Sequence, residues 1–178
     1  SLLPAARSIE NGVHYFDVPE GAFENAYLSV RRKEGRLYTD AEVRRLPYPS
    51  AGHPHRAEWR LRARSFRRLK KYFDRAETNG PVLDLGCGNG WLTRHLGDWF
   101  EEEVIGLDVN RTELEQAARV NPHAHAAFVC GDIFEVPFPE GAFRYIVLNA
   151  SAQYFPSLPG LLDRLLHLLS PEGEVHIL

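Results

Sequence analysis

The sequence predicts an α/β fold in which helices cover a doubly wound, mostly parallel sheet. From residue 81 onward, short apolar runs alternate with helical segments of about 10–15 residues, which is typical of βαβ units. A length of 178 residues suits one domain with a buried core, and a composition of 44% hydrophobic and 25% charged residues is that of a globular protein. These values exclude disordered, collagen-like and disulfide-rich classes.

The first 80 residues are expected to form a helical and irregular N-terminal extension. Prolines and a glycine between residues 47 and 54 predict an irregular stretch. Over residues 55–77, apolar residues recur at steps of three or four, which predicts an amphipathic helix with one buried face. The residues of this apolar stripe are Trp59, Ala63, Phe66, Leu69, Phe73 and Ala76.

The polar side of this helix is basic. Residues 1–80 hold 16 Lys and Arg and 10 Asp and Glu, which gives a charge of +6. The other 98 residues hold 5 Lys and Arg and 14 Asp and Glu, which gives −9 and a net charge of −3 for the chain. Arg60, Arg64, Arg67 and Lys71 fall on one face of the helix. Two interpretations stay open: a solvated basic face, or a stripe that binds phosphate groups.

Residues 81–178 are expected to form the core of the fold, with the sheet ending near its fifth strand. The predicted strands are 81–85, 104–107, 126–130, 145–148 and 174–178, and the predicted helices are 91–100, 112–120 and 158–169. Ligands of such sheets bind beyond the carboxyl ends of the strands, so functional residues should follow the strands directly.

A glycine-rich loop follows the first of these strands, in the run Asp84-Leu85-Gly86-Cys87-Gly88-Asn89-Gly90. Glycines let a ligand approach the backbone, and the following helix offers free N–H groups. Asp108 ends the next strand, where a carboxylate can accept hydrogen bonds from ribose hydroxyls. An adenosine-type cofactor is therefore expected. NAD is disfavoured, because its fingerprint requires a glycine where this chain has Trp91.

These motifs resemble those of the class I S-adenosylmethionine-dependent methyltransferases, which have a Rossmann-like fold. The resemblance covers residues 81–178, and it implies S-adenosylmethionine as the cofactor and S-adenosylhomocysteine as its product. The glycine loop matches the family's first motif, and the acids after the second and third strands match those that contact ribose and adenine. The implied cofactor-binding residues are Asp84, Gly86, Cys87, Gly88, Asn89, Gly90, Asp108, Val109, Asn110, Asp132, Ile133, Asn149, Ala150 and Ser151.

The resemblance also implies in-line transfer of a methyl group, and we expect a small-molecule acceptor. Two alternatives stay open. An RNA methyltransferase would dock nucleic acid on the basic helix, and a non-catalytic module would only bind S-adenosylmethionine. Residues 149–154 lack the (Asp/Asn)-Pro-Pro-(Tyr/Phe) signature of enzymes that methylate amino groups of bases, which favours the small molecule.

Candidate catalytic residues are Tyr154, His53 and His55. In many relatives the N-terminal extension folds over the pocket, so residues 1–80 are expected to act as a lid. No metal is expected, since His53, His55 and Glu58 are too few ligands. The two cysteines form no disulfide framework and no apolar run could span a bilayer, so we expect a cytoplasmic protein with no membrane partner.

Overall fold

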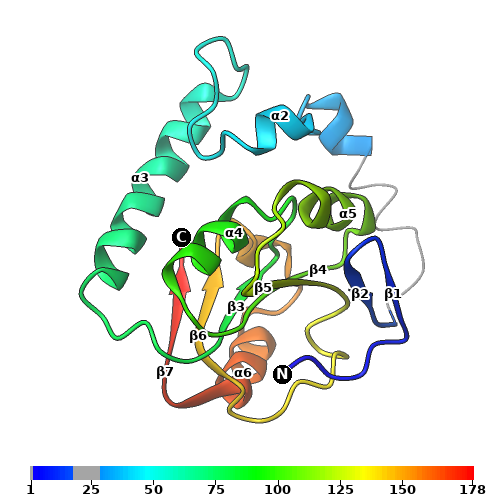
Figure 1. The fold of residues 1–178 in the computed structure, drawn as a ribbon, viewed down its shortest axis with the longest axis vertical. Coiled ribbons are helices and arrows are strands. Elements are labelled where there is room, and N and C mark those ends of the chain that lie inside the picture. The colour runs from blue at the N-terminus through cyan, green and yellow to red at the C-terminus, as the bar shows by residue number, and fades with distance from the viewer. Residues whose placement is uncertain (1, 18–28) are drawn as a thin grey trace. The chain divides into compact units, whose positions relative to one another are not determined.

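The computed structural model describes residues 2–17 and 29–178 (Figure 1). Its residues group into two compact units, which are described separately. The first unit joins Ser1–Val18 to Thr78–Leu178, and the second comprises Pro19–Glu77.

A seven-stranded sheet forms the framework of the first unit. The strands lie in the order β1-β2-β5-β4-β3-β6-β7, and each neighbouring pair is parallel except β1 and β2. The alternating pattern of strands and helices predicted this architecture, and the α/β class with a mostly parallel sheet is confirmed. The strands are β1 (Ser8–Glu10), β2 (Val13–Tyr15), β3 (Val82–Leu85), β4 (Val104–Asp108), β5 (Ala126–Cys130), β6 (Phe143–Leu148) and β7 (Leu169–Ile177).

Helices cover both faces of this sheet. Helix α6 (Leu158–Leu168) buries three leucines against one face, where Leu83 of β3 and Ile105 of β4 are fully buried. Helices α4 (Trp91–Trp99) and α5 (Arg111–Val120) lie on the other side of the sheet (Figure 1). Successive side chains of a strand point to opposite faces, so Asp84 and Gly106 face α4, where the glycine leaves room for Thr93.

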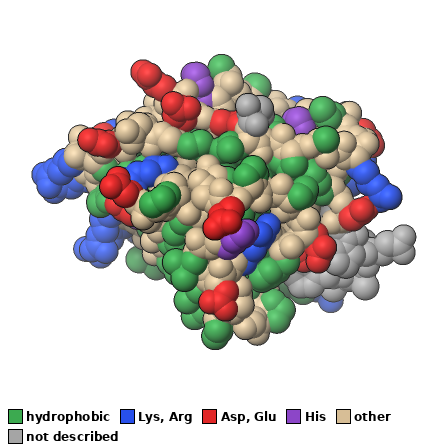
Figure 2. All heavy atoms as spheres, turned by 90° about the horizontal axis from the view of Figure 1, so that it is seen from below, with side chains coloured by type: hydrophobic (Ala, Val, Ile, Leu, Met, Phe, Trp, Pro, Cys, Tyr) green, Lys and Arg blue, Asp and Glu red, His purple; other side chains and the backbone are tan. Residues whose placement is uncertain are grey.

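The outer face of α6 remains apolar. Leu158, Leu162 and Leu166 lie one helical turn apart, with exposed fractions of 51%, 37% and 66%. Figure 2 views the molecule from the side of α6 and shows hydrophobic side chains among charged ones at the surface. None of the helices in residues 2–17 and 29–178 is long and apolar enough to cross a membrane.

The first residues of the chain differ from the extension predicted over residues 1–80. Strands β1 and β2 form a hairpin around Asn11 and Gly12, both with positive φ, and β2 then pairs with β5 in parallel. Val13 is fully buried at this edge. An Asn-Gly pair between short strands is a strong hairpin signal, but three-residue strands carry too little periodicity to be recognised as part of a distant sheet.

The end of the chain also differs in detail from the prediction. Residues 170–173 were predicted as a turn between helix and strand, but β7 starts at Leu169 directly after α6. The pairing with β6 shifts register between Phe143 and Tyr145, and this irregularity accommodates the Ser-Pro-Glu-Gly segment within the strand. The core strands β3 to β7 are five, as the sequence predicted.

The second unit contains the predicted basic helix, α3 (Arg56–Phe73). It ends four residues before the predicted boundary at residue 77, with Asp74 as its C-cap. The apolar stripe is buried from Trp59 to Phe73, and the Trp59 indole donates a 3.0 Å hydrogen bond to the Tyr38 hydroxyl. The short helix α2 (Asp40–Val43) begins with a capping box between Thr39 and Glu42.

We predict that Gly90→Ala destabilises the protein by about 2–5 kcal/mol. Gly90 has a φ of +72°, and a Cβ there would lie 2.6 Å from the Phe128 ring and 2.7 Å from the Ala117 Cβ. The left-handed conformation costs an L-residue about 1–2 kcal/mol and overpacking about 1–3 kcal/mol. Urea unfolding measures the loss. Gly160→Ala, in helix α6, is the control and should change stability by less than about 1 kcal/mol; equal effects at the two positions would contradict this packing argument.

Candidate active site

The loop between β3 and α4 is packed tightly at both of its ends and open at its centre. A Cβ on Gly86 would lie 2.4 Å from the Ser151 Cβ, and Gly90 contacts Phe128 in the same restrictive way. A Cβ added to Gly88 would meet only the Glu113 carboxylate, whose atoms would lie 3.5 Å or more from it. Two glycines are therefore required by the packing of the protein itself, whereas Gly88 leaves backbone accessible to a ligand.

Asp108, at the carboxyl end of β4, is held beside this loop. Its Oδ2 accepts a 2.8 Å hydrogen bond from the Gly88 N–H, and its Oδ1 accepts one of 2.9 Å from the Asn110 N–H. Burial, and then the nearby charge of Glu113, raises the pKa of Asp108 to about 6. Each carboxylate oxygen has a second acceptor site, so Asp108 retains capacity for hydroxyl donors of a ligand.

Asp84 supports the loop from inside the sheet. Only 1% of its surface is exposed, and its Oδ2 accepts a 2.7 Å hydrogen bond from the Thr93 hydroxyl of α4. Burial, together with the neighbouring charge of Asp108, raises the pKa of Asp84 to about 7. Cys87 and Asn89 are buried as well. The structure therefore places these three predicted residues behind the accessible surface of the loop.

Asn110 carries a buried polar group without a partner among the described residues. It caps α5, because its Oδ1 accepts a 3.0 Å hydrogen bond from the Glu113 N–H. Its Nδ2 is buried and makes no hydrogen bond within the described part of the chain. A buried donor without an acceptor costs roughly 1–3 kcal/mol, and this one lies two residues from Asp108. It therefore fits a site that is completed by a polar ligand.

Glu113 is a residue that sequence analysis missed. It is 4% exposed, and its carboxylate is the group next to Gly88. The only signal in the sequence is the Asn-x-x-Glu spacing at the start of α5, which reads as helix capping. That pattern gives no hint that the side chain turns toward the glycine loop.

The loops after β5 and β6 complete the same edge of the sheet. The Gly131 N–H donates a 3.0 Å hydrogen bond to the Asp108 carbonyl, which brings Asp132 beside the end of β4. The Ser151 hydroxyl donates one of 2.6 Å to the Leu85 carbonyl, so the segment after β6 lies against the glycine loop. Asn149, Ala150, Val109 and Asp132 are partly exposed, while Ile133 packs in the core.

Tyr154 follows this segment in the short helix η1 (Ala152–Tyr154) and is 55% exposed. Its backbone N–H donates a 3.1 Å hydrogen bond to the Ser151 carbonyl, which ties it to the loop after β6. The exposed phenol is available to a substrate that enters beside this loop. Its catalytic role stays a prediction.

His53 and His55 lie in the second unit. The Nδ1 of His53, which is 6% exposed, accepts a 3.1 Å hydrogen bond from the His55 N–H, and the His55 Nε2 lies 2.8 Å from the Glu34 carbonyl. The two rings and that of Tyr38 form one aromatic cluster. Their catalytic role also stays a prediction. Among residues 2–17 and 29–178, no group of three acidic, His or Cys side chains is arranged to hold a metal.

The sheet order and the four loops at its carboxyl edge define a Rossmann-like α/β domain with a glycine-rich binding loop. A family model described as "Methyltransferase domain" matches residues 82–173, more than half of the chain. The chain therefore belongs to this family, the class I S-adenosylmethionine-dependent methyltransferases.

Individual relatives match mainly this core. The malonyl-[acyl-carrier protein] O-methyltransferase of Halorhodospira halophila is 33% identical over 53% of this chain and 32% of its own length. The sterol 24-C-methyltransferase of Aspergillus fumigatus is 30% identical over 52% of this chain and 26% of its own length. The chain thus spans about a third or less of these curated relatives.

A solved methyltransferase structure is also similar to this chain over part of its length. The phosphoethanolamine N-methyltransferase 2 of Haemonchus contortus, in complex with phosphomonomethylethanolamine and S-adenosylhomocysteine, superposes with a TM-score of 0.57 and 28% identity. The match covers 64% of this chain and 27% of that one.

We predict that Asp84 makes the protein less stable as the pH rises from about 4 to 7. Its pKa is about 7 when folded against 3.8 for the free group, so in this range the native state holds a proton that the unfolded state has lost. The slope for one such group approaches about 1.4 kcal/mol per pH unit. Below and above this window, the contribution of Asp84 to the slope vanishes.

Urea unfolding of wild type and Asp84→Asn between pH 4 and 8 measures this effect. The difference in stability between them should move in favour of the variant as the pH rises, because the amide introduced in the variant cannot ionise. Asp163→Asn, at an exposed position of α6, is the matched control and should leave the pH profile unchanged. Parallel profiles for wild type and Asp84→Asn would refute the assignment.

Proposed function

We propose that the chain binds S-adenosylmethionine at the carboxyl edge of its sheet and transfers the methyl group to a small-molecule acceptor. The observation that carries this proposal is the 2.8 Å hydrogen bond between the Gly88 N–H and the Asp108 carboxylate. It joins an open glycine loop to a strand-end acid, and the unpartnered amide of Asn110 lies beside them in the described part of the chain.

The chain offers distinct groups to the parts of this cofactor. Asp108 has free acceptor sites for ribose hydroxyls, and Asn110 has a free donor among the described residues. Asp132 is the candidate acceptor for the adenine amine, with Val109 beside the nucleoside. Asn149 and Ala150 are the candidates for the methionine part. When bound, the cofactor supplies a methyl group that is already activated by the sulfonium charge.

The protein's own contribution is alignment, electrostatics and exclusion of water. Holding two reactants in line can supply up to about 7–11 kcal/mol of the barrier. The carboxylates of Asp108 and Glu113 make the edge of the sheet electronegative, which suits a cationic ligand. A proton acceptor is needed only for acceptors that must lose a proton early. Tyr154, His53 and His55 are the candidates for that role.

The acceptor is proposed as a small molecule on two grounds. The relatives named above act, by their names, on malonyl-[acyl-carrier protein], a sterol and phosphoethanolamine. Residues 149–154 also lack the signature of enzymes that methylate amino groups of bases. A lid role for the N-terminal residues and a cytoplasmic location, consistent with the two free cysteines, are parts of the same proposal.

Thermal unfolding with added ligand tests cofactor binding. S-adenosylhomocysteine at about 100 times its Kd should stabilise the fold by about 2.7 kcal/mol and raise Tm by about 5–10 °C, whereas NAD should not. Asp108→Ala should abolish the shift, because the ribose acceptor is lost. Asp163→Ala is the matched control and should keep it. An undiminished shift in folded Asp108→Ala, or an equal shift with NAD, would overturn the cofactor assignment.

Transfer of a radiolabelled methyl group to a panel of lipid, carboxylic acid, amine and RNA acceptors tests the reaction. On the acceptor that is labelled, Tyr154→Phe should lower kcat by about 10²–10⁴-fold if the ionised Tyr154 oxygen accepts the proton that the methyl acceptor loses, with S-adenosylhomocysteine affinity unchanged. Tyr72→Phe, another exposed tyrosine, is the control. An unchanged kcat would remove Tyr154 as the proton acceptor, and labelling of RNA alone would refute the small-molecule acceptor.

A further inference from the structure

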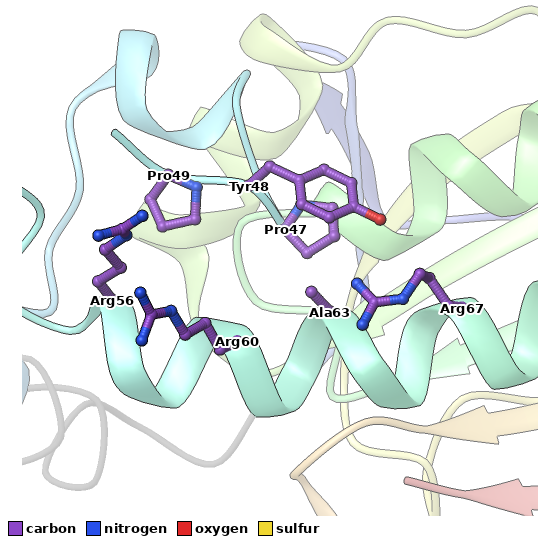
Figure 3. Close-up of a pocket in the computed structure, with 7 residues that line it drawn as sticks. All are labelled: Pro47, Tyr48, Pro49, Arg56, Arg60, Ala63 and Arg67. Atoms are coloured by element: carbon purple, nitrogen blue, oxygen red, sulfur yellow. The ribbon is translucent and has the colours of Figure 1, made fainter. Parts of the chain in front are cut away.

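The second unit contains a groove that the methyl-transfer site does not use. It has a volume of about 300 Å³ and lies between helix α3 and residues 47–49. Figure 3 shows the guanidinium groups of Arg56, Arg60 and Arg67 rising from α3 toward this segment, with the ring of Tyr48 above Ala63. The groove is therefore lined by cations on one side and by rings on the other.

The three arginines of the groove have no acidic partner within the described residues. Helix α3 carries eight Lys and Arg but only one acid, Glu58. That carboxylate already accepts hydrogen bonds from Arg36 at 2.6 Å and from Arg62 at 2.8 Å. Guanidinium groups left without a counter-charge on a concave surface attract anions, and phosphate matches their fork of donors.

The length of the cationic row favours a chain of phosphates over a single phosphate. Arg56 and Arg67 are eleven residues apart on one helix, which corresponds to about 16 Å along its axis. Arg64 lies within this row, and Arg68 and Lys71 extend it beyond Arg67; none of these three makes an ion pair within the described part of the chain. A linear polyanion can contact such a row at successive positions, whereas one phosphate reaches only one end.

Tyr48 indicates what kind of polyanion the groove fits. The Tyr48 ring is 55% exposed. The backbone around it is fixed, because the neighbouring Pro47 is buried and the Tyr48 N–H donates a 2.7 Å hydrogen bond to the Arg45 carbonyl. The ring also packs edge-on against Phe66, with centroids 6.5 Å apart. A fixed, exposed aromatic ring beside a row of cations is the arrangement on which unpaired bases stack in proteins that bind single strands.

We propose that this groove binds single-stranded nucleic acid, with phosphates on Arg56, Arg60 and Arg67 and a base stacked on Tyr48. Carboxylates of an acidic peptide would satisfy the arginines but would leave the exposed part of the tyrosine ring uncovered. A double helix keeps its bases stacked internally. The inference concerns a second surface and does not depend on the acceptor proposed above. Binding is measured without S-adenosylmethionine, so either proposal can fail alone.

Fluorescence anisotropy with a labelled single-stranded RNA of about 12 nucleotides tests the proposal on the full chain, since single-strand modules cover about 4–16 nucleotides. The triple variant Arg56→Gln/Arg60→Gln/Arg67→Gln should weaken binding at least about tenfold and reduce the slope of log K against log salt by about 2. The control Arg32→Gln/Lys33→Gln/Arg75→Gln removes the same charge from exposed residues outside the groove and should bind nearly as wild type.

The base contact is tested separately. Tyr48→Ala should weaken binding about 5- to 150-fold with the salt slope unchanged, whereas Tyr48→Phe keeps the ring and should bind as wild type. Circular dichroism and Tm verify that each variant is folded.

Four outcomes would overturn the proposal. The control triple could lose as much affinity as the groove triple. Folded Tyr48→Ala could bind RNA as wild type does, which would leave only a general attraction for polyanions. ADP alone could bind as tightly as the oligonucleotide, which would make the groove a mononucleotide pocket. A polyglutamate peptide of the same length could compete as well as RNA, which would point to an acidic protein partner.

Discussion

The site depends on the close approach of one loop to three neighbouring elements. Gly90 must lie directly against Phe128 and Ala117, and Gly86 directly against Ser151. Only with these contacts in place does the Gly88 N–H reach the Asp108 carboxylate at 2.8 Å. Because protein interiors are close-packed, an added methyl group at either end would displace the loop. The Gly88 N–H would then no longer lie within hydrogen-bond distance of Asp108.

The close packing around the glycine loop also brings three acidic side chains into a small volume. Asp84 lies one residue before the end of β3, and Asp108 ends the adjacent parallel strand β4. Glu113 lies in the first turn of the helix that follows. Burial and the charge of Asp108 raise the pKa of Asp84 to about 7, and burial and the charge of Glu113 raise that of Asp108 to about 6. Without a ligand this costs stability, as does the amide of Asn110, which is unpartnered among the described residues. A cofactor that carries a positive charge and hydroxyl groups offsets both costs. The groups that destabilise the free protein therefore include those that the proposed ligand would contact.

Helix α3 illustrates how one sequence pattern can serve two purposes. Its apolar stripe is buried and holds the second unit together, while its arginines lie outside that stripe. Because Glu58 already pairs with Arg36 and Arg62, the arginines of the groove have no acidic partner within the described residues. Three of the basic residues of this helix thus line a groove together with an exposed tyrosine, a combination that a merely solvated helix face does not require.

The sequence alone determined the βαβ core, the glycine loop, Asp108 and the basic helix, because each rests on a local signal: alternating apolar runs, glycine spacing or a helical stripe. Tertiary structure decided what involves partners distant in sequence. The hairpin of residues 8–15 joins β5 more than 100 residues later, Glu113 turns toward Gly88, and Tyr48 meets the arginines of α3. Local periodicity records which face of an element is buried, but not which element buries it, and that choice is made only when the whole chain packs.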